Sequence, residues 1–438
     1  MVKINEPYIR IRGKTILSGK VKIAGAKNSA LPAIVAACMS NDNVTLSNIP
    51  IHINDVKILI ELLNASGANI KIIDENTIVC NGKDFIGGQL DESKCNKIRH
   101  SLLILGLSAR WRKNVIIPMT GGCDLGNRKH DMHISALTQT FNDVKESNGI
   151  YLQPRKLITK SHIKIDFYYP TFGGTLNALY SAVALNKVHT VITNGAINPE
   201  VTDVVKLLNQ MGANIKIKSH NEYHVYGVDK LRGTKYDIIP DRIIAATVIA
   251  ATGITNGNVT IENFNSKYLK TEILTWRRCG LIIEQEDTNL HVRRNGMIKP
   301  VNITTQAYPG FHTDIQPLHA VLMLHADGQS EIKETILDGR FKYCDELIKT
   351  GAQINVINAD FECVNGAQGQ IAIIKGSTKA YTPNTLIATD IRGGAAVALQ
   401  AMTIEGESFI TNLYQLERGY ESFVELFKSL GADIWRVS

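Results

Sequence analysis

The chain has 438 residues, of which 44% are hydrophobic and 20% are charged. This length allows two or three domains with full cores, and this composition excludes a disordered, collagen-like or membrane-embedded chain. No apolar run approaches the roughly 20 residues that span a bilayer. The first residues lack the apolar core of a secretion signal, so we expect a cytoplasmic protein that does not bind membranes.

Cysteine usage and charge narrow the class further. The seven cysteines show no C-x-x-C pair, which argues against a disulfide framework and a zinc ribbon and indicates free thiols. The net charge of +7 is spread along the chain, as suits small anionic ligands such as phosphates and carboxylates. Nucleic-acid binding is the weaker alternative, because no Lys/Arg run with interleaved aromatic residues occurs.

Six buried helices are predicted in chain order. Their residues are small and apolar nearly all round, which is typical of helices enclosed within a domain. They are expected within residues 29–38, 101–109, 173–185, 241–253, 314–326 and 390–402.

A second kind of helix ends each time on a glycine. Ahead of three of these glycines the apolar residues follow an i, i+3, i+4, i+7 spacing, as in Val201, Val204, Val205 and Leu208. Glycine in a left-handed conformation would end each helix before a strand. The five glycines are Gly67, Gly212, Gly280, Gly351 and Gly431.

The spacing of these glycines predicts a repeat protein. They lie 145, 68, 71 and 80 residues apart, so the long gap holds two periods with one degraded copy near residues 134–145. We therefore predict an α/β fold of six repeats, grouped as two domains of three. The alternative, a doubly wound sheet, lacks its expected Gly-rich phosphate loop.

The segment IAGAKNSALP places Lys27 and Asn28 after a strand and at the start of the first buried helix. Free amide groups, the helix dipole and a lysine together make an anion site. A solvated capping lysine is the alternative.

A glycine-flanked loop carries Cys123, followed by Arg128 and Lys129. A thiol among cations is chemically reactive. An inert loop cysteine is the alternative. Zinc bound by Cys123, His130, Asp131 and His133 is a poor alternative, because the spacing matches no standard zinc site.

A third group contains Asp314, Arg340, Asp390, Arg392 and Arg418. Each residue stands just before a predicted helix or in a loop between repeats, where functional residues gather. Arginine forks suit carboxylate and phosphate. Each residue alone is more simply explained as a surface ion pair, but several at equivalent points of the repeats favour a site.

Taken together, the phrases GAKNSALP, GGCDLGNR, PGFHTDIQ, TDIR and ERGYE resemble the enolpyruvyl transferase family, in that family's order from about residue 8 to the C-terminus. The resemblance implies an inside-out, barrel-like α/β fold. One domain would contain residues 27–239 and the Cys123 loop, and the other residues 1–26 with 240–438. The active-site cleft would lie between them.

The resemblance also implies the reaction. The enolpyruvyl group of phosphoenolpyruvate would pass to the 3-hydroxyl of UDP-N-acetylglucosamine with release of phosphate, in peptidoglycan synthesis and without metal or cofactor. Cys123 would be the general acid and Asp314 the base. Lys27, Arg99, Arg128 and Arg418 would surround the phosphate, and Arg340 and Arg392 the carboxylate. Further substrate-binding positions would be Asn28, Lys129, His130, Asp131, Met132, Thr171, Phe172, Ile336 and Asp390.

Several positions depart from the family pattern. Lys129 and His130 stand where Pro-Val is common beside the uridine, and His312 replaces a common proline. These departures concern the acceptor more than the reaction. The alternatives are therefore enolpyruvyl transfer to another nucleotide, or a non-catalytic paralogue that binds sugar nucleotides. Shikimate 3-phosphate is disfavoured, because that branch has Lys-Ser or Lys-Thr in place of Lys27-Asn28 and lacks the cysteine loop.

Overall fold

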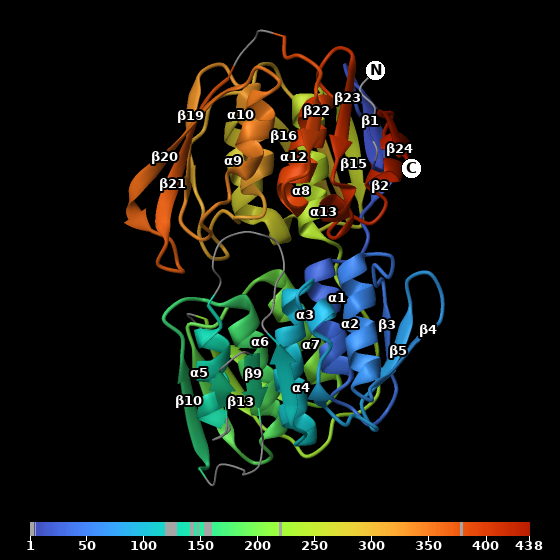
Figure 1. The fold of residues 1–438 in the computed structure, drawn as a ribbon, viewed down its shortest axis with the longest axis vertical. Coiled ribbons are helices and arrows are strands. Elements are labelled where there is room, and N and C mark those ends of the chain that lie inside the picture. Colours follow the sequence, from blue (N-terminus) through green and yellow to red (C-terminus); the bar gives the residue numbers. More distant parts are fainter. Residues whose placement is uncertain are drawn as a thin grey trace. The chain divides into compact units, whose positions relative to one another are not determined.

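The computed structural model describes residues 4, 6–118, 129–140, 144–146, 149–152, 160–218, 221–376 and 380–438. These residues form two compact units (Figure 1). Unit 1 contains the chain up to Ile23 together with Asp241–Ser438, and unit 2 contains residues 24–118 and 129–240. Each unit has its own hydrophobic core.

Each of the six sheets has four strands in the same arrangement, and three of the six build it from consecutive elements of the chain. A first strand is followed by a buried helix and a parallel second strand, and an amphipathic helix then leads into a hairpin that pairs antiparallel with the second strand. The example in unit 2 consists of β10 (His162–Asp166), α6 (Phe172–Ala184), β11 (His189–Thr193), α7 (Pro199–Gln210), β12 (Asn214–Lys218) and β13 (Glu222–Tyr226).

The two other sheets of unit 2 have the same strand arrangement, but the second takes its first strand from the end of the unit. One contains β6 (Gly88–Gln89), α4 (Ile104–Trp111), β7 (Val115–Pro118), α5 (Asp131–Thr140), β8 (Val144–Glu146) and β9 (Gly149–Leu152), with the short helices α3 (Glu92–Cys95) and η1 (Arg99–Leu103) before α4. The other contains α1 (Lys27–Ala37), β3 (Val44–Ser47), α2 (Asn54–Ala65), β4 (Asn69–Ile72), β5 (Ile78–Asn81) and β14 (Lys235–Asp237).

Unit 1 repeats the scheme three times. The first repeat consists of β2 (Ser18–Lys22), α8 (Arg242–Ile254), β15 (Asn258–Glu262), η2 (Ser266–Leu269), α9 (Lys270–Arg278), β16 (Leu281–Glu286) and β17 (Asn289–Arg294). The second consists of β18 (Ile303–Thr304), α10 (Gln316–Leu324), β19 (Gln329–Glu334), α11 (Lys342–Ile348), β20 (Gln353–Glu362) and β21 (Gln368–Lys375). The third consists of β22 (Thr385–Ile387), α12 (Ile391–Ala401), β23 (Glu407–Thr411), α13 (Leu413–Glu417), α14 (Phe423–Ser429), β24 (Asp433–Val437) and β1 (Tyr8–Arg12).

Strands distant in sequence complete three of the six sheets. The N-terminal segment supplies β1, which lies between β23 and β24, and β2, which pairs in parallel with β15. In unit 2, β14 pairs in parallel with β3. Each of these three sheets thus contains one strand that lies far along the chain from the other three.

The predicted sixfold repeat is confirmed. The five helix-ending glycines have φ between 88° and 102°, a conformation that is costly for residues with a Cβ. The degraded copy is present as α5 and β8. Ahead of Gly431, the same apolar spacing in Tyr420, Phe423, Val424 and Phe427 predicts a longer helix than the structure has. The helix α14 begins at Phe423, and the buried Tyr420 lies before it.

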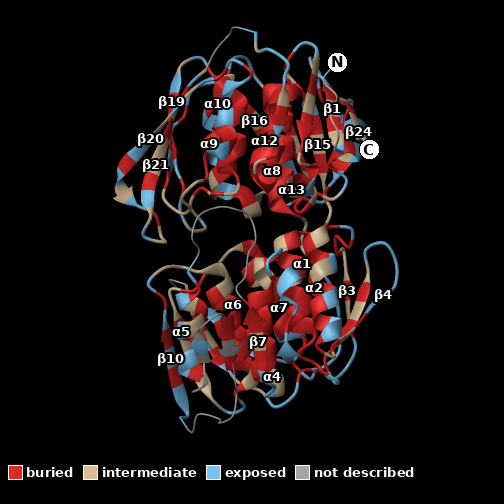
Figure 2. Cartoon of the chain, viewed as in Figure 1, coloured by how far each residue is buried: buried red, intermediate tan, exposed pale blue. Residues whose placement is uncertain are grey.

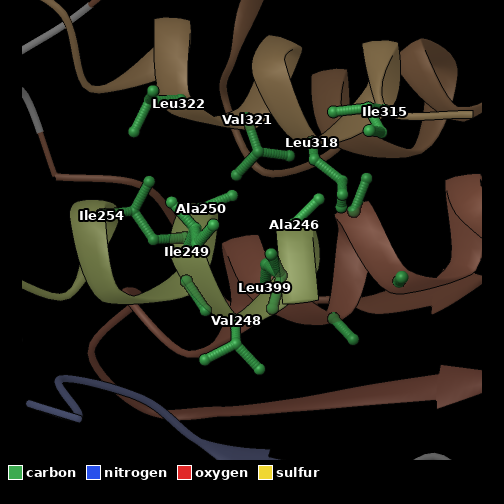
Figure 3. Close-up of a cluster of buried hydrophobic side chains, with 14 of the residues drawn as sticks. Ala246, Val248, Ile249, Ala250, Ile254, Ile315, Leu318, Val321, Leu322 and Leu399 are labelled. Carbon is green, nitrogen blue, oxygen red and sulfur yellow. The ribbon is translucent and has the colours of Figure 1, made fainter. Parts of the chain in front are cut away.

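The six predicted buried helices are also confirmed, and they form the cores (Figure 2). In unit 1, Ala246 and Ile249 of α8 face Leu318 and Val321 of α10, and Leu399 of α12 lies beside them (Figure 3). Small residues on α8 allow this close approach, and each fully buried large aliphatic side chain contributes about 1.5–3 kcal/mol. None of the helices in the described ranges is long and apolar enough to cross a membrane.

Candidate active site

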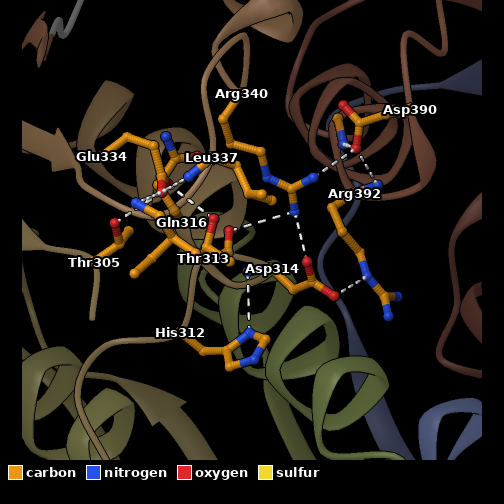
Figure 4. Close-up of polar contacts among 12 residues, drawn as sticks. Thr305, His312, Thr313, Asp314, Gln316, Glu334, Leu337, Arg340, Asp390 and Arg392 are labelled. Carbon is orange, nitrogen blue, oxygen red and sulfur yellow. Dashed lines mark hydrogen bonds and ion pairs between the residues drawn. The ribbon is translucent and has the colours of Figure 1, made fainter. Parts of the chain in front are cut away.

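In unit 1, Asp314 lies between two arginines (Figure 4). Its Oδ1 accepts from Arg340 Nη2 at 2.9 Å, and its Oδ2 lies 3.5 Å from Arg392 Nε. Both arginine side chains are almost fully buried, whereas 24% of the Asp314 side chain is exposed. The carboxylate is therefore held in place by buried charges and still reaches solvent.

Asp390 ties this cluster to the start of α12. Its Oδ1 accepts from the backbone amides of Arg392 and Gly393, at 2.9 and 3.2 Å, and also from Arg340 Nη1 at 3.3 Å. Asp390 is thus the N-cap of a buried helix, and in the same place it compensates a buried guanidinium. Aspartate is suited to both tasks, because a short carboxylate reaches the helix amides.

Glu334 organises the loop behind Asp314 (Figure 4). Its carboxylate accepts from the hydroxyls of Thr305 and Thr313 and from the amides of Ile336 and Leu337, all at 2.9 to 3.1 Å. Burial raises the pKa of Glu334, although these donors and Arg340 oppose that shift. The backbone of Ile336, a predicted binding residue, is therefore held by the buried Glu334 carboxylate.

His312 stands beside the same loop. Its backbone amide donates to Glu272 Oε1 at 3.0 Å, and its Nδ1 accepts from the Asp314 amide at 3.1 Å. Burial, reinforced by the charge of Arg242, lowers the pKa of His312 to about 3, so the ring is neutral near pH 7.

Arg392 continues the cluster toward Tyr420. Its guanidinium carbon lies 5.1 Å from the centre of the Tyr420 ring, and the Tyr420 hydroxyl bonds to Thr247 at 2.8 Å. Burial acts to lower the pKa of Arg392, but Tyr420 and Asp314 outweigh it and raise that pKa. Among the described residues, the buried Nη1 of Arg392 has no hydrogen-bond partner.

Arg418 is buried at the end of α13, where its Nη1 donates to Gln415 Oε1 at 3.2 Å. It follows that a predicted phosphate-binding residue is positioned by its own helix.

In unit 2, Lys27 is buried and forms a 2.6 Å ion pair with Asp55 of α2. The solvated-lysine alternative is therefore wrong. Next to it, Asp203 of α7 accepts from the hydroxyls of Ser29 and Tyr236, and from the Ile239 amide. These bonds fix the N-terminus of α1, where Lys27 and the half-buried Asn28 lie.

Arg99 contacts the segment before α5. Its Nη2 donates to the Lys129 carbonyl at 2.8 Å, and its Nη1 lies 3.4 Å from His130 Nε2. His130 is buried and Lys129 is exposed. The exposed Asp131 accepts from the Tyr168 hydroxyl at 2.9 Å.

The last predicted binding residues lie nearby on α5 and at the start of α6. Thr171 is the N-cap of α6, and its hydroxyl accepts from the Gly174 amide at 3.3 Å. Phe172 makes an edge contact with His100, and Met132 packs against the core of unit 2.

Cys123 and Arg128 lie outside the described residues. The six other cysteines are buried. Within the described ranges, no group of three or more His, Cys, Asp or Glu side chains is arranged to hold a metal ion.

Sequence reasoning missed the supporting residues. Asp55, Glu334 and Asp203 carry no local signal, because each is one acid in an ordinary helix or strand. For His133 the sequence suggests only a role as a zinc ligand. It is buried, its Nδ1 lies 2.8 Å from Asn177 Nδ2, and burial lowers its pKa to about 3.

The chemistry available in unit 1 is well defined. A partly exposed carboxylate can accept a proton, and buried arginines can bind a carboxylate or phosphate next to it. Fold and cluster together are those of an enolpyruvyl-transferring enzyme. The chain belongs to the family described as EPSP synthase (3-phosphoshikimate 1-carboxyvinyltransferase), which matches residues 11–427.

Within that family, the chain is similar to enzymes named UDP-N-acetylglucosamine 1-carboxyvinyltransferase. It is 35% identical over 427 residues to the one from Halothermothrix orenii, covering 98% of this chain and 99% of that one. It is 36% identical over 420 residues to enzyme 1 of Caldanaerobacter subterraneus subsp. tengcongensis, covering 96% and 97%. The fold is that of the enolpyruvyl transferase NikO from Streptomyces tendae, with a TM-score of 0.85 at 23% identity over 99% of both chains.

Proposed function

We propose that this enzyme transfers the enolpyruvyl group of phosphoenolpyruvate to the 3-hydroxyl of UDP-N-acetylglucosamine and releases phosphate. The observation that carries the proposal is Asp314, a partly exposed carboxylate held between the buried Arg340 and Arg392. The names of full-length relatives at 35–36% identity support the choice of substrates.

Asp314 is the base in this proposal. The acceptor hydroxyl gives its proton to the carboxylate while its oxygen bonds to the central carbon of phosphoenolpyruvate. Cys123 gives a proton to the methylene carbon, which leaves a tetrahedral adduct. Loss of phosphate and of a proton from the new methyl group then yields the enolpyruvyl ether.

Buried cations bind the anionic donor substrate. Arg392 is suited to its carboxylate, because its Nη1 has no hydrogen-bond partner among the described residues and is ready to donate. Lys27 and Arg418 are assigned to the phosphate. Asp55 holds Lys27 by a 2.6 Å ion pair, so that this cation is fixed in place before substrate binds.

The reaction would be the first committed step of peptidoglycan synthesis, and it would place the enzyme in the cytoplasm and in cell-wall biogenesis, cell shape and division.

Phosphate release from phosphoenolpyruvate tests the proposal. UDP-N-acetylglucosamine should support release by the wild type, and Asp314→Asn should lose it. The matched control is Asp433→Asn, which changes a partly exposed aspartate that pairs with Arg12 on β1, outside the cluster. Absence of release with UDP-N-acetylglucosamine and with every other acceptor would favour a non-catalytic sugar-nucleotide-binding protein.

A second acceptor is favoured by one observation. Lys129 and His130 put a cation and an imidazole where the family pattern has an apolar pair, and Arg99 contacts both residues. Another uridine nucleotide, tested as UMP in the same assay, is therefore the second candidate.

A further inference from the structure

The loop before Asp314 is fastened to α9. The Pro309 carbonyl accepts from the Thr271 hydroxyl, and the His312 amide donates to Glu272 Oε1 at 3.0 Å. Between these two points, the Phe311 ring packs edge-on against Trp276, with ring centres 6.5 Å apart. The backbone is thus fixed up to His312.

The next fixed point is the His312 side chain. Its Nδ1 accepts from the Asp314 amide at 3.1 Å, two residues further along the chain. This is the bond that an asparagine or aspartate side chain makes in an Asx turn. Asp314 precedes α10, so its amide has no acceptor within that helix.

Such a bond requires a neutral imidazole. A ring nitrogen accepts only when it carries no proton, so the proton is on Nε2. The charged groups that act on the ring are Arg242, Arg340, Arg392 and Asp314, and with burial their combined effect lowers the pKa of His312 to about 3. The acceptor is therefore retained at every pH at which the enzyme is expected to work.

We propose that His312 is a positioning residue for the reaction: through its bond to the Asp314 amide it sets the direction in which the Asp314 carboxylate points. The inference rests on the proposed role of Asp314 as base. The carboxylate must meet Arg340 on one oxygen and Arg392 on the other, and a rotated backbone would break this double contact. A proline at this position would supply neither the amide donor nor the ring acceptor.

Two substitutions with amide side chains, His312→Asn and His312→Gln, distinguish this positioning role from other roles of the ring. Asparagine places an acceptor oxygen where histidine has Nδ1, whereas glutamine places its polar atoms nearer the position of Nε2. His312→Asn should therefore keep kcat within about 3-fold of the wild type. His312→Gln and His312→Leu should lower kcat by about 10- to 100-fold, because small misplacements of a catalytic group have effects of this size. KM for phosphoenolpyruvate should change little in all three.

The control is His291→Leu. The His291 ring also bonds through Nδ1, to Thr260 at 3.0 Å, but it lies on β17 outside the cluster, so this variant should match the wild type. Circular dichroism and thermal melting would identify variants that fail to fold, and kcat is compared per folded molecule.

Equal kcat in His312→Leu and the wild type, or rescue by Gln rather than Asn, would overturn the inference while leaving the proposed function intact. An inactive wild type would instead overturn the proposed function, and the inference with it.

Discussion

Asp390 offers the sharpest test of the energetics, because one oxygen atom serves two roles. Its Oδ1 caps α12 through two backbone amides and also accepts from Arg340. Losing an N-cap costs about 1 kcal/mol. Removing one partner of a buried ion pair costs about 3–5 kcal/mol. After loss of Asp390, Arg340 still pairs with Asp314 at 2.9 Å, which is closer than its 3.3 Å contact with Asp390. We therefore expect loss of the Asp390–Arg340 pair to cost only about 2 kcal/mol of the free energy of unfolding.

Asp390→Ala should thus lower the free energy of unfolding by about 3 kcal/mol, and Tm by about 6–12 °C at 2–4 °C per kcal/mol. Asp390→Asn keeps an acceptor oxygen for the helix amides and loses only the charge, so it should cost about 1 kcal/mol less than alanine.

Urea unfolding followed by tryptophan fluorescence is the assay. Trp276 and Trp435 belong to unit 1, which contains Asp390, and Trp111 belongs to unit 2. Equal midpoints for the two variants would refute the capping role. Ordinary surface substitutions change stability by up to about 0.5 kcal/mol. If both variants lie within this margin of the wild type, the stabilising role of the buried Asp390–Arg340 ion pair is refuted as well.

Three further predictions follow from the site and the cores. Asp314→Ala should lower turnover by about 10²- to 10⁴-fold while the acceptor still binds, as steady-state kinetics and calorimetry would show; loss of binding alone would contradict its role as base. Cys123 should be the first thiol that iodoacetamide labels at about pH 8, because burial raises the pKa of Cys95 to about 11 and of Cys279 to about 12. Peptide mapping that finds Cys95 or Cys279 labelled before Cys123 would refute the prediction. Burial lowers the pKa of His319 to about 4, so between about pH 6.5 and 4 the unfolded chain binds a proton that the folded chain does not, and stability falls as pH drops. His319→Gln should weaken this pH dependence of the unfolding free energy, measured by urea unfolding, by up to one bound proton. An unchanged pH dependence would argue against a neutral His319.

Local patterns predicted the repeated elements well. Helix-ending glycines, apolar periodicity and small-residue helices each depend on a few neighbouring residues, and the structure confirms them. Strand pairing was less accessible. Nothing in the composition of β1 or β14 shows which distant strand it joins, because pairing is set by the closure of a whole unit.

The same division holds for the candidate site. Asp314, Arg340, Asp390 and Arg392 were predicted as a group from their places before helices, and the structure brings all four into one network. The acids that support the site could not be predicted. Asp55 precedes no motif and lies 28 positions after Lys27 in the sequence, and only folding brings the two together.

The pairing of β1 and β2 with strands beyond residue 257 has a consequence for synthesis on the ribosome. Both strands are made before the 217 residues of Ala24–Pro240, and β1 waits longest, because 394 residues separate Arg12 from Glu407 at the start of β23. At about 5–20 residues per second, the 394-residue interval takes roughly 20–80 s. During it, unit 2 can complete its sheets, whereas Ile9 and Ile11 of β1, buried in the finished protein, remain exposed to water. An apolar strand is thus unpaired from the synthesis of β1 until that of β23 and β24.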